Sequence, residues 1–145
     1  MKHEELINEW QSDCQIDSTN LKHEMLKIPN LHAKYLREYN SNHNSAKTYE
    51  FKYNKLKNIK IEYYSGNLDK ETLDEYGWEQ FDLRIGSKGN LDRYIAADQD
   101  LIDLLKRKYY HEESSELCKQ ILDQLKSRTF QIKGAIEYEK FQAGM

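Results

Sequence analysis

The stretch CKQILDQLKSRTFQIKGAI, residues 118–136, decides the fold, because its seam positions recur at alternating spacings of three and four. The apolar members of this seam are Cys118, Leu122, Leu125, Ile132 and Ile136. An apolar repeat kept over several heptads is typical of a long helix that packs against another helix. The sequence therefore predicts a long C-terminal helix that starts near Asp98.

Two interpretations of this seam fit its pattern. It is either a coiled-coil surface on which copies of the chain associate, or the core-facing stripe of a helix in a single-chain bundle. Charged residues make up 32% of the 145 residues and hydrophobic ones 38%. Such a polar composition suits long helices with narrow apolar stripes, which favours self-association through the C-terminal helix.

A second periodic stretch, rich in tyrosine, precedes the first. From Tyr39 to Tyr63 the same alternating steps recur, which predicts a helix over about residues 30–65 that ends at Gly66. Pro29 is expected to end a shorter helix before it, because proline lacks a backbone donor and clashes with the preceding turn. The polar run at residues 40–45 competes for backbone hydrogen bonds and is a candidate break.

The remaining segments are short. We expect an amphipathic helix over residues 2–13, and another from Asp69 to Tyr76 that is closed by Gly77. Residues 78–89 fit either a hairpin or an irregular connection, and Asn90 is placed to cap a helix over Leu91–Ala97.

The fold class expected from these elements is mainly α, with long helices and a coiled-coil-like C-terminal helix. Residues 1–97 would form a helical N-terminal region, and residues 98–145 a long C-terminal helix that would supply self-association.

Composition narrows the function classes. The net charge is −3, so any contact with nucleic acid must come from a local patch. Cys14 and Cys118 lie far apart, which argues against a disulfide framework or a zinc site and for a reducing cytosol. No run approaches the roughly 18 apolar residues of a membrane span, so we expect an intracellular protein without a membrane partner.

The motifs that would support catalysis are missing from the sequence. Residues 86–89, GSKG, lack the spacing and the ending of a phosphate-binding loop. His111 is followed by two glutamates but not by a second histidine four residues on, so no metal-ligand pair forms. We therefore predict a protein that is no enzyme and has no catalytic residue, metal or cofactor.

Charge is segregated along the second periodic stretch. Between Lys47 and Lys60 there are five lysines and one acid, a balance of +4, and tyrosines interleave with them. Lysines can contact phosphates and tyrosine rings can stack on bases. The alternative is an ordinary solvated helix face. The candidate DNA-binding residues are Lys55, Lys57, Lys60, Tyr63 and Tyr64.

Three blocks in this order resemble the UvsY family, the recombination mediators of tailed phages. They are IDSTNL at residues 16–21, YYSG at residues 63–66, and KSRTFQIK at residues 126–133 running on to FQAG at residues 141–144. The match spans nearly the whole chain.

The resemblance implies a role without catalysis. Proteins of this family bind single-stranded DNA and assemble into rings, with self-association in the C-terminal region. They help a phage RecA-like recombinase to load onto DNA covered by the phage single-strand-binding protein. The expected partners are therefore the recombinase, the single-strand-binding protein, single-stranded DNA and further copies of the chain. Residues 1–97 would make the DNA and partner contacts. The resemblance places the protein in the cytoplasm of the infected host cell.

The resemblance also implies that basic residues just before YYSG contribute to DNA binding. Lys60 stands at one such position, whereas Asn58 stands where another basic residue is expected. Lys57 and Lys55 can substitute, because a phosphate contact tolerates small shifts better than base readout does. The alternative function is a coiled-coil structural or adaptor protein that binds no nucleic acid.

Overall fold

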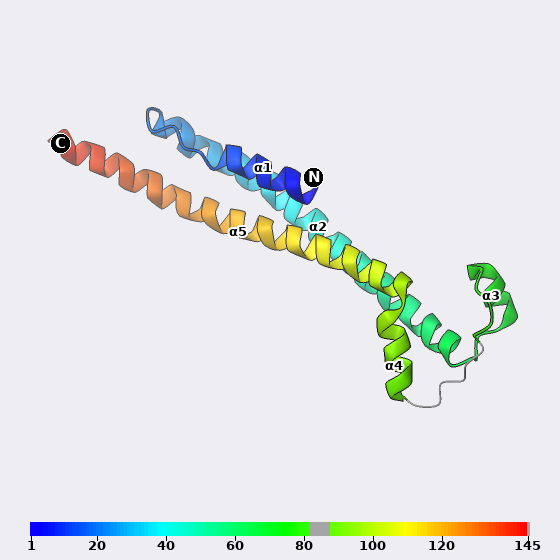
Figure 1. The fold of residues 1–145 in the computed structure, drawn as a ribbon. Helices are drawn as coiled ribbons and strands as arrows, with labels where there is room; N and C mark the ends of the chain where they lie inside the picture. The colour runs from blue at the N-terminus through cyan, green and yellow to red at the C-terminus, as the bar shows by residue number, and fades with distance from the viewer. Residues whose placement is uncertain (82–87, 145) are drawn as a thin grey trace. The chain divides into compact units, whose positions relative to one another are not determined.

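The chain is mainly helical in the residues that the computed structural model describes, 1–81 and 88–144. Within them it forms α1 (His3–Asp13), α2 (Leu21–Tyr64), α3 (Lys70–Tyr76), α4 (Lys88–Ala97) and α5 (Gln99–Gln142), and no strand (Figure 1). The mainly α fold class and the long C-terminal helix are confirmed.

The chain divides into two compact units, and each of the two long helices contributes residues to both. The terminal unit comprises Met1–Asn44 and Tyr110–Met145, and the central unit comprises Ser45–Tyr109. The predicted division between residues 97 and 98 concerns function and not compactness, so these units do not test it and it stays a prediction.

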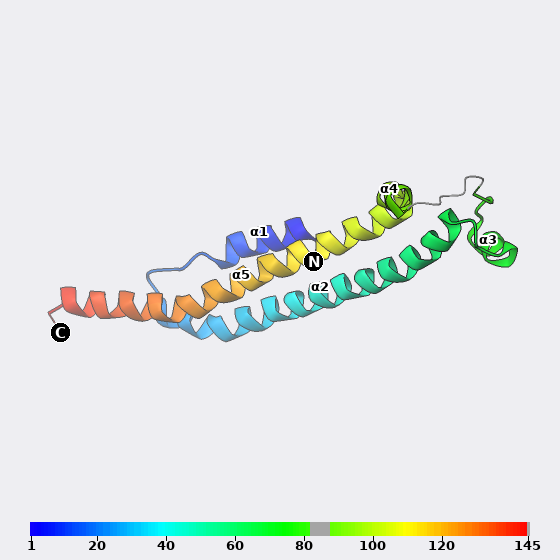
Figure 2. The same cartoon turned by 90° about the horizontal axis from the view of Figure 1, so that it is seen from below.

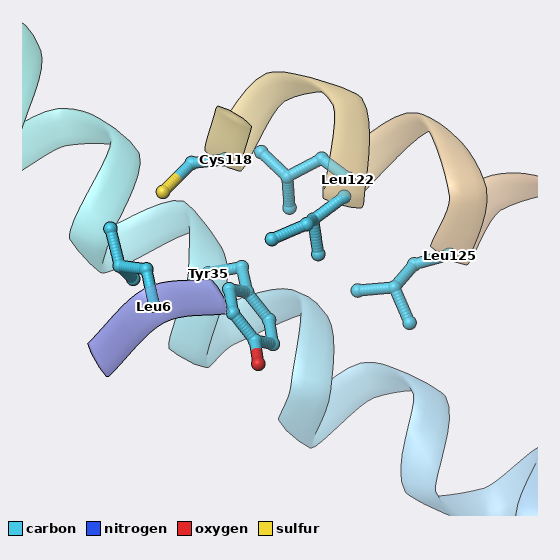
Figure 3. Close-up of a cluster of buried hydrophobic side chains, with 6 residues drawn as sticks. Leu6, Tyr35, Cys118, Leu122 and Leu125 are labelled. Carbon is cyan, nitrogen blue, oxygen red and sulfur yellow. The ribbon is translucent and has the colours of Figure 1, made fainter. Parts of the chain in front are cut away.

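The core of the terminal unit joins α1, α2 and α5. Its buried residues are Leu6, Tyr35, Cys118, Ile121, Leu122 and Leu125, and Figure 3 shows side chains from the three helices converging. Trp10 packs edge-on against Tyr35, with ring centroids 5.6 Å apart. Much of the apolar seam is therefore core within a single chain.

Arg128 ties the end of α1 to α5. Its guanidinium donates hydrogen bonds to the carbonyl oxygens of Asp13 at 3.1 Å and Cys14 at 2.9 Å. It also lies 5.4 Å from the ring centroid of Trp10. The last carbonyls of a helix lack hydrogen-bond donors within the helix and carry partial negative charge. The buried Arg128 supplies both the donors and a compensating positive charge. This contact holds α1 alongside α5 (Figure 2).

The expectation that Pro29 ends a helix was wrong, because α2 continues through it. A proline inside a helix removes one hydrogen bond and costs about 3 kcal/mol. Here its side chain is exposed, while Leu31 and Tyr35, which follow it in the helix, pack in the core of the terminal unit. Packing of the helix after the proline therefore outweighs the local preference for a stop.

The candidate break at residues 40–45 also lies inside α2. The buried Asn42 uses its side chain without breaking the helix. Its Nδ2 donates to the carbonyl oxygen of Glu38 at 2.9 Å, and its Oδ1 lies 2.9 Å from Nδ1 of His111. A partner from α5 thus absorbs the hydrogen-bonding capacity that would otherwise compete with the backbone.

The glycine stops of α2 and α3 are confirmed. Gly66 has φ +75° and Gly77 has φ +70°, a left-handed conformation that glycine adopts without a steric cost. The N–H of Asn67 donates to the carbonyl oxygen of Glu62 at 2.9 Å, which closes the end of α2.

Of the predicted starts of α4 and α5, one is wrong and one is confirmed. α4 begins at Lys88, so Asn90 lies inside the helix and does not cap it. α5 begins directly after Asp98, whose Oδ1 accepts the N–H of Leu101 at 3.1 Å, as an N-cap does. The connection expected at residues 78–89 falls partly on residues 82–87, outside the described residues.

Candidate nucleic-acid interface

The lysines of α2 in the central unit lie on more than one side of the helix. Lys52 and Lys55 are exposed and line the same hollow, together with Leu56. Lys57 is half-buried, with its Nζ 5.9 Å from the ring centroid of Tyr53. Residues two apart on a helix do not face each other, so the structure does not bring the candidates Lys55 and Lys57 together.

Arg107 of α5 joins Lys52 beside one aromatic ring. The Arg107 guanidinium lies 5.8 Å and the Lys52 Nζ 5.3 Å from the ring centroid of Tyr49. We call Lys52, Lys55 and Arg107 the basic rim. Lys52 is one of the five lysines of the lysine-rich stretch but not one of the named candidates, and Arg107 belongs to a second basic run, residues 106–108, that the sequence offers only as an alternative site. The three-residue spacing of Lys52 and Lys55 is a usable signal, whereas Arg107 joins them only through tertiary packing.

Lys60, the third lysine candidate, is buried in ion pairs. Its side chain is 6% exposed, and its Nζ lies 3.0 Å from Oδ2 of Asp98 and 2.9 Å from Oδ2 of Asp100. The side chain of Asp98 is 4% exposed, whereas that of Asp100 is 57% exposed. Tyr64 donates its hydroxyl to the same Oδ2 of Asp98 at 2.6 Å. Lys60 thus links the end of α2 to the start of α5.

The titration of these groups reflects the network. Burial alone would lower the pKa of the Lys60 ammonium, but hydrogen bonds to Asp100 and Asp98 outweigh burial and raise it. For Asp98, burial would raise the pKa, yet the hydrogen bonds from Tyr64, the Leu101 backbone and Lys60 lower it. Burial, followed by the bond to Asp98, raises the pKa of Tyr64. The lysine and the aspartate are therefore both charged at neutral pH.

The tyrosine candidates belong to an aromatic cluster. Tyr63 contacts Trp78 at a centroid distance of 5.2 Å and donates its hydroxyl to the carbonyl oxygen of Glu79 at 2.8 Å. Tyr64 packs on Phe81 at 5.0 Å and on Tyr94 at 5.5 Å. Their rings join α2 to the segments that follow it, which is a packing role within the central unit.

The five seam residues expected to mediate oligomerisation are differently placed. Cys118, Leu122 and Leu125 lie in the core of the terminal unit. Ile132 is 1% exposed and Ile136 is half-buried. The large apolar side chains that α5 leaves open near its end are Phe130, 77% exposed, Tyr138, 60%, and Phe141, 79%. Sequence reasoning passed over these three because they lie off the heptad positions.

No group of three or more His, Cys, Asp or Glu that could hold a metal ion occurs among the described residues. In the same part of the chain, no helix has the length and hydrophobicity needed to cross a membrane.

Similarity to known proteins covers almost the whole chain. The sequence pattern of a family described as recombination, repair and single-stranded DNA-binding protein UvsY matches residues 9–145. The recombination protein uvsY of Enterobacteria phage T4 is 28% identical over 144 residues, which is 99% of this chain and 99% of that protein.

Solved structures agree with the sequence match. Two crystal structures of the bacteriophage T4 recombination mediator protein UvsY superpose with TM-scores of 0.86 and 0.85, each at 26% identity. The first covers 99% of this chain and 98% of the T4 chain, and the second 97% and 99%. The resemblance seen in the three sequence blocks is thereby confirmed.

Proposed function

Since this chain belongs to the UvsY family of recombination, repair and single-stranded DNA-binding proteins, we propose that it acts as a recombination mediator. It binds single-stranded DNA and helps a phage RecA-like recombinase to load onto DNA covered by the phage single-strand-binding protein, in the cytoplasm of the infected host cell. The observation that carries this proposal is the family match over residues 9–145. A coiled-coil adaptor without nucleic-acid binding would not account for that match.

The basic rim is the proposed phosphate contact. Lys52, Lys55 and Arg107 are exposed, and their charges lie on neighbouring surfaces of α2 and α5. Lys57, beside Tyr53, supplies a contact on another side of α2. Binding to phosphates releases counterions, so it is strong at low salt and indifferent to sequence.

The other three site candidates have a supporting part in this proposal. Lys60 contributes by holding the ends of two helices, because its ammonium is already paired with two carboxylates. Tyr63 and Tyr64 contribute by fixing the aromatic cluster on which the neighbouring surface rests. A site whose residues are held by such contacts binds without first ordering itself.

Assembly into a ring is the second part of the proposal. Phe130, Tyr138 and Phe141 leave an apolar surface on the last turns of α5, and contact between copies would bury it. The half-buried Ile136 adjoins this surface in sequence, and the buried Ile132 supports it from inside the chain. Repeating the basic rim around a ring raises avidity by about 10²–10⁴ without any new contact.

Loading then needs no catalysis. A protein that holds DNA in a form favourable to the recombinase and unfavourable to the single-strand-binding protein shifts the balance between them. The size of the shift equals the difference between this protein's binding free energies for the two forms of the DNA.

Removing the basic rim should weaken DNA binding without changing the fold. In the double variant Lys52→Ala/Lys55→Ala, the affinity for single-stranded DNA is expected to fall. The slope of its logarithm against log salt should shrink by about 0.7 for each lost phosphate contact. Fluorescence anisotropy of a labelled oligonucleotide at several salt concentrations measures both quantities.

A matched control removes equal charge elsewhere. Lys22→Ala/Lys119→Ala replaces two exposed lysines of the terminal unit and should keep most of the affinity and the full slope. If both double variants bind like the unaltered chain, the basic rim is not the DNA contact.

A further inference from the structure

Two adjoining hollows on the central unit share an aromatic and aliphatic lining, and we call the two together the hollow. Leu56 of α2, Leu104 of α5 and Tyr76 line both of its parts. Tyr76 stacks on Trp78 with ring centroids 4.5 Å apart and planes 17° from parallel. Tyr76 is 40% exposed, so part of its ring remains available to a planar ligand.

The stacked rings are held in place by the ion-pair network. The Nζ of Lys60 lies 4.0 Å from the ring centroid of Trp78, and this lysine is itself fixed by Asp98 and Asp100. A cation near an aromatic ring is attracted to its face. The indole thus contacts both a fixed ammonium and the Tyr76 ring, so the aromatic platform is already formed before any ligand arrives.

Charges around the hollow differ in sign from place to place. Lys52 and Lys55 of α2 line one part of it. Arg107 of α5 lines the other part, together with the carboxylates of Asp100 and Asp103. Phosphates are attracted to the three cations and repelled by the carboxylates, whereas the amino groups of bases can donate hydrogen bonds to carboxylate oxygens.

We propose that this hollow takes one unpaired base of single-stranded DNA, stacked on Tyr76, while the adjacent phosphates lie on the basic rim. The inference rests on the proposed function, because it places the base of a strand whose backbone the rim binds. Aromatic stacking accepts any base, so it adds affinity without sequence preference. Stacking on Tyr76 also makes the affinity for a strand with bases higher than the affinity for an abasic phosphate chain.

Tryptophan fluorescence tests the proposal directly. The chain has two tryptophans, Trp10 and Trp78, so Trp10→Phe leaves Trp78 as the single reporter. This variant is titrated with an oligothymidylate and with an abasic oligonucleotide of equal length and charge. The oligothymidylate should quench Trp78 and bind about tenfold more tightly, since stacking of one base is typically worth that ratio. The abasic strand should bind without quenching.

Two substitutions separate the platform from the rim. Tyr76→Ala should lower the affinity for oligothymidylate about tenfold and leave the affinity for the abasic strand unchanged. Phe51→Ala is the control, because it removes an aromatic side chain of α2 that is 67% exposed and does not line the hollow. This control variant should change neither affinity. If circular dichroism shows that Trp10→Phe does not fold, the single variant Trp78→Phe, which keeps Trp10, is titrated in its place. DNA should still bind to it, but the quenching seen with the unaltered chain should be lost.

The outcomes distinguish this inference from the proposed function. If both strands bind equally and Trp78 is not quenched, the base pocket is wrong and backbone binding stands. Quenching that follows protein concentration without DNA would assign the hollow to a second copy of the chain and overturn the inference. If neither strand binds, the proposed function fails together with it.

Discussion

Replacing Lys60 by alanine is expected to lower the free energy of unfolding by about 3 kcal/mol. The substitution leaves the carboxylate of Asp98, 4% exposed, buried without its cation, and an uncompensated buried charge is strongly destabilising. Urea denaturation followed by circular dichroism measures the loss. Lys55→Ala, which removes an exposed lysine of the same helix, is the control and should cost less than about 0.5 kcal/mol.

The pH dependence of this loss has a definite sign. Folding lowers the pKa of Asp98, so its carboxylate contributes stability above its ordinary pKa and loses that contribution as pH falls through the lowered value. Without Lys60 the carboxyl takes up its proton at a higher pH, which removes the buried charge. The stability difference between the unaltered chain and Lys60→Ala should therefore shrink as the solution is acidified below neutrality.

A second variant tests whether Lys60 acts through Asp98. Lys60→Met/Asp98→Asn removes both charges, keeps an oxygen that can cap α5 and should recover part of the lost stability, because a neutral pair leaves no buried charge. An equal loss for Lys60→Ala and Lys55→Ala would contradict the structural role, and Lys60 would then be better assigned to direct DNA contact.

Leu125→Ala is expected to cost about 3 kcal/mol, within the range found for leucine truncations in protein cores. Leu125 is 0% exposed and lies in the core cluster with Tyr35 and Leu122. The cavity arises inside one chain, so denaturation should show the loss even in dilute solution. Phe130→Ala is the matched control on the same helix, because Phe130 is 77% exposed, and its effect on unfolding should be small.

Sedimentation of the same two variants separates core from interface. Phe130→Ala should reduce the mass of the assembly, since it removes apolar surface that we propose to be buried between copies. Leu125→Ala should lower the assembly mass only at denaturant concentrations where the chain unfolds. If Leu125→Ala instead gives fully stable but dissociated chains, the seam would be an intermolecular surface, as the coiled-coil interpretation holds.

Local signals predicted the helices well where one residue controls the outcome. Gly66 and Gly77 end their helices because the backbone turns left-handed there. Pro29 misled the prediction because its local cost, about 3 kcal/mol, is offset by the packing of Leu31 and Tyr35 after it. The polar run around Asn42 misled it too, since the partner of that amide, His111, is distant in sequence.

The candidate site was harder to predict than the fold. The pattern identified a lysine-rich helix, but a lysine on the solvent side and a lysine in a buried ion pair look alike in sequence. Lys60 is distinguished from Lys55 only by Asp98 and Asp100, which arrive from the start of α5. For the same reason Arg107 could not be grouped with Lys52 before the helices were placed.

The most direct test of the mediator role is recombinase loading on a covered strand. Single-stranded DNA is first saturated with the phage single-strand-binding protein, and the DNA-dependent ATPase of the phage recombinase is then followed with and without this chain. We expect the chain to shorten the lag and restore the rate, and we expect Lys52→Ala/Lys55→Ala to restore less. A lag and a rate that stay the same when the chain is added, although it binds the bare strand, would contradict the mediator role.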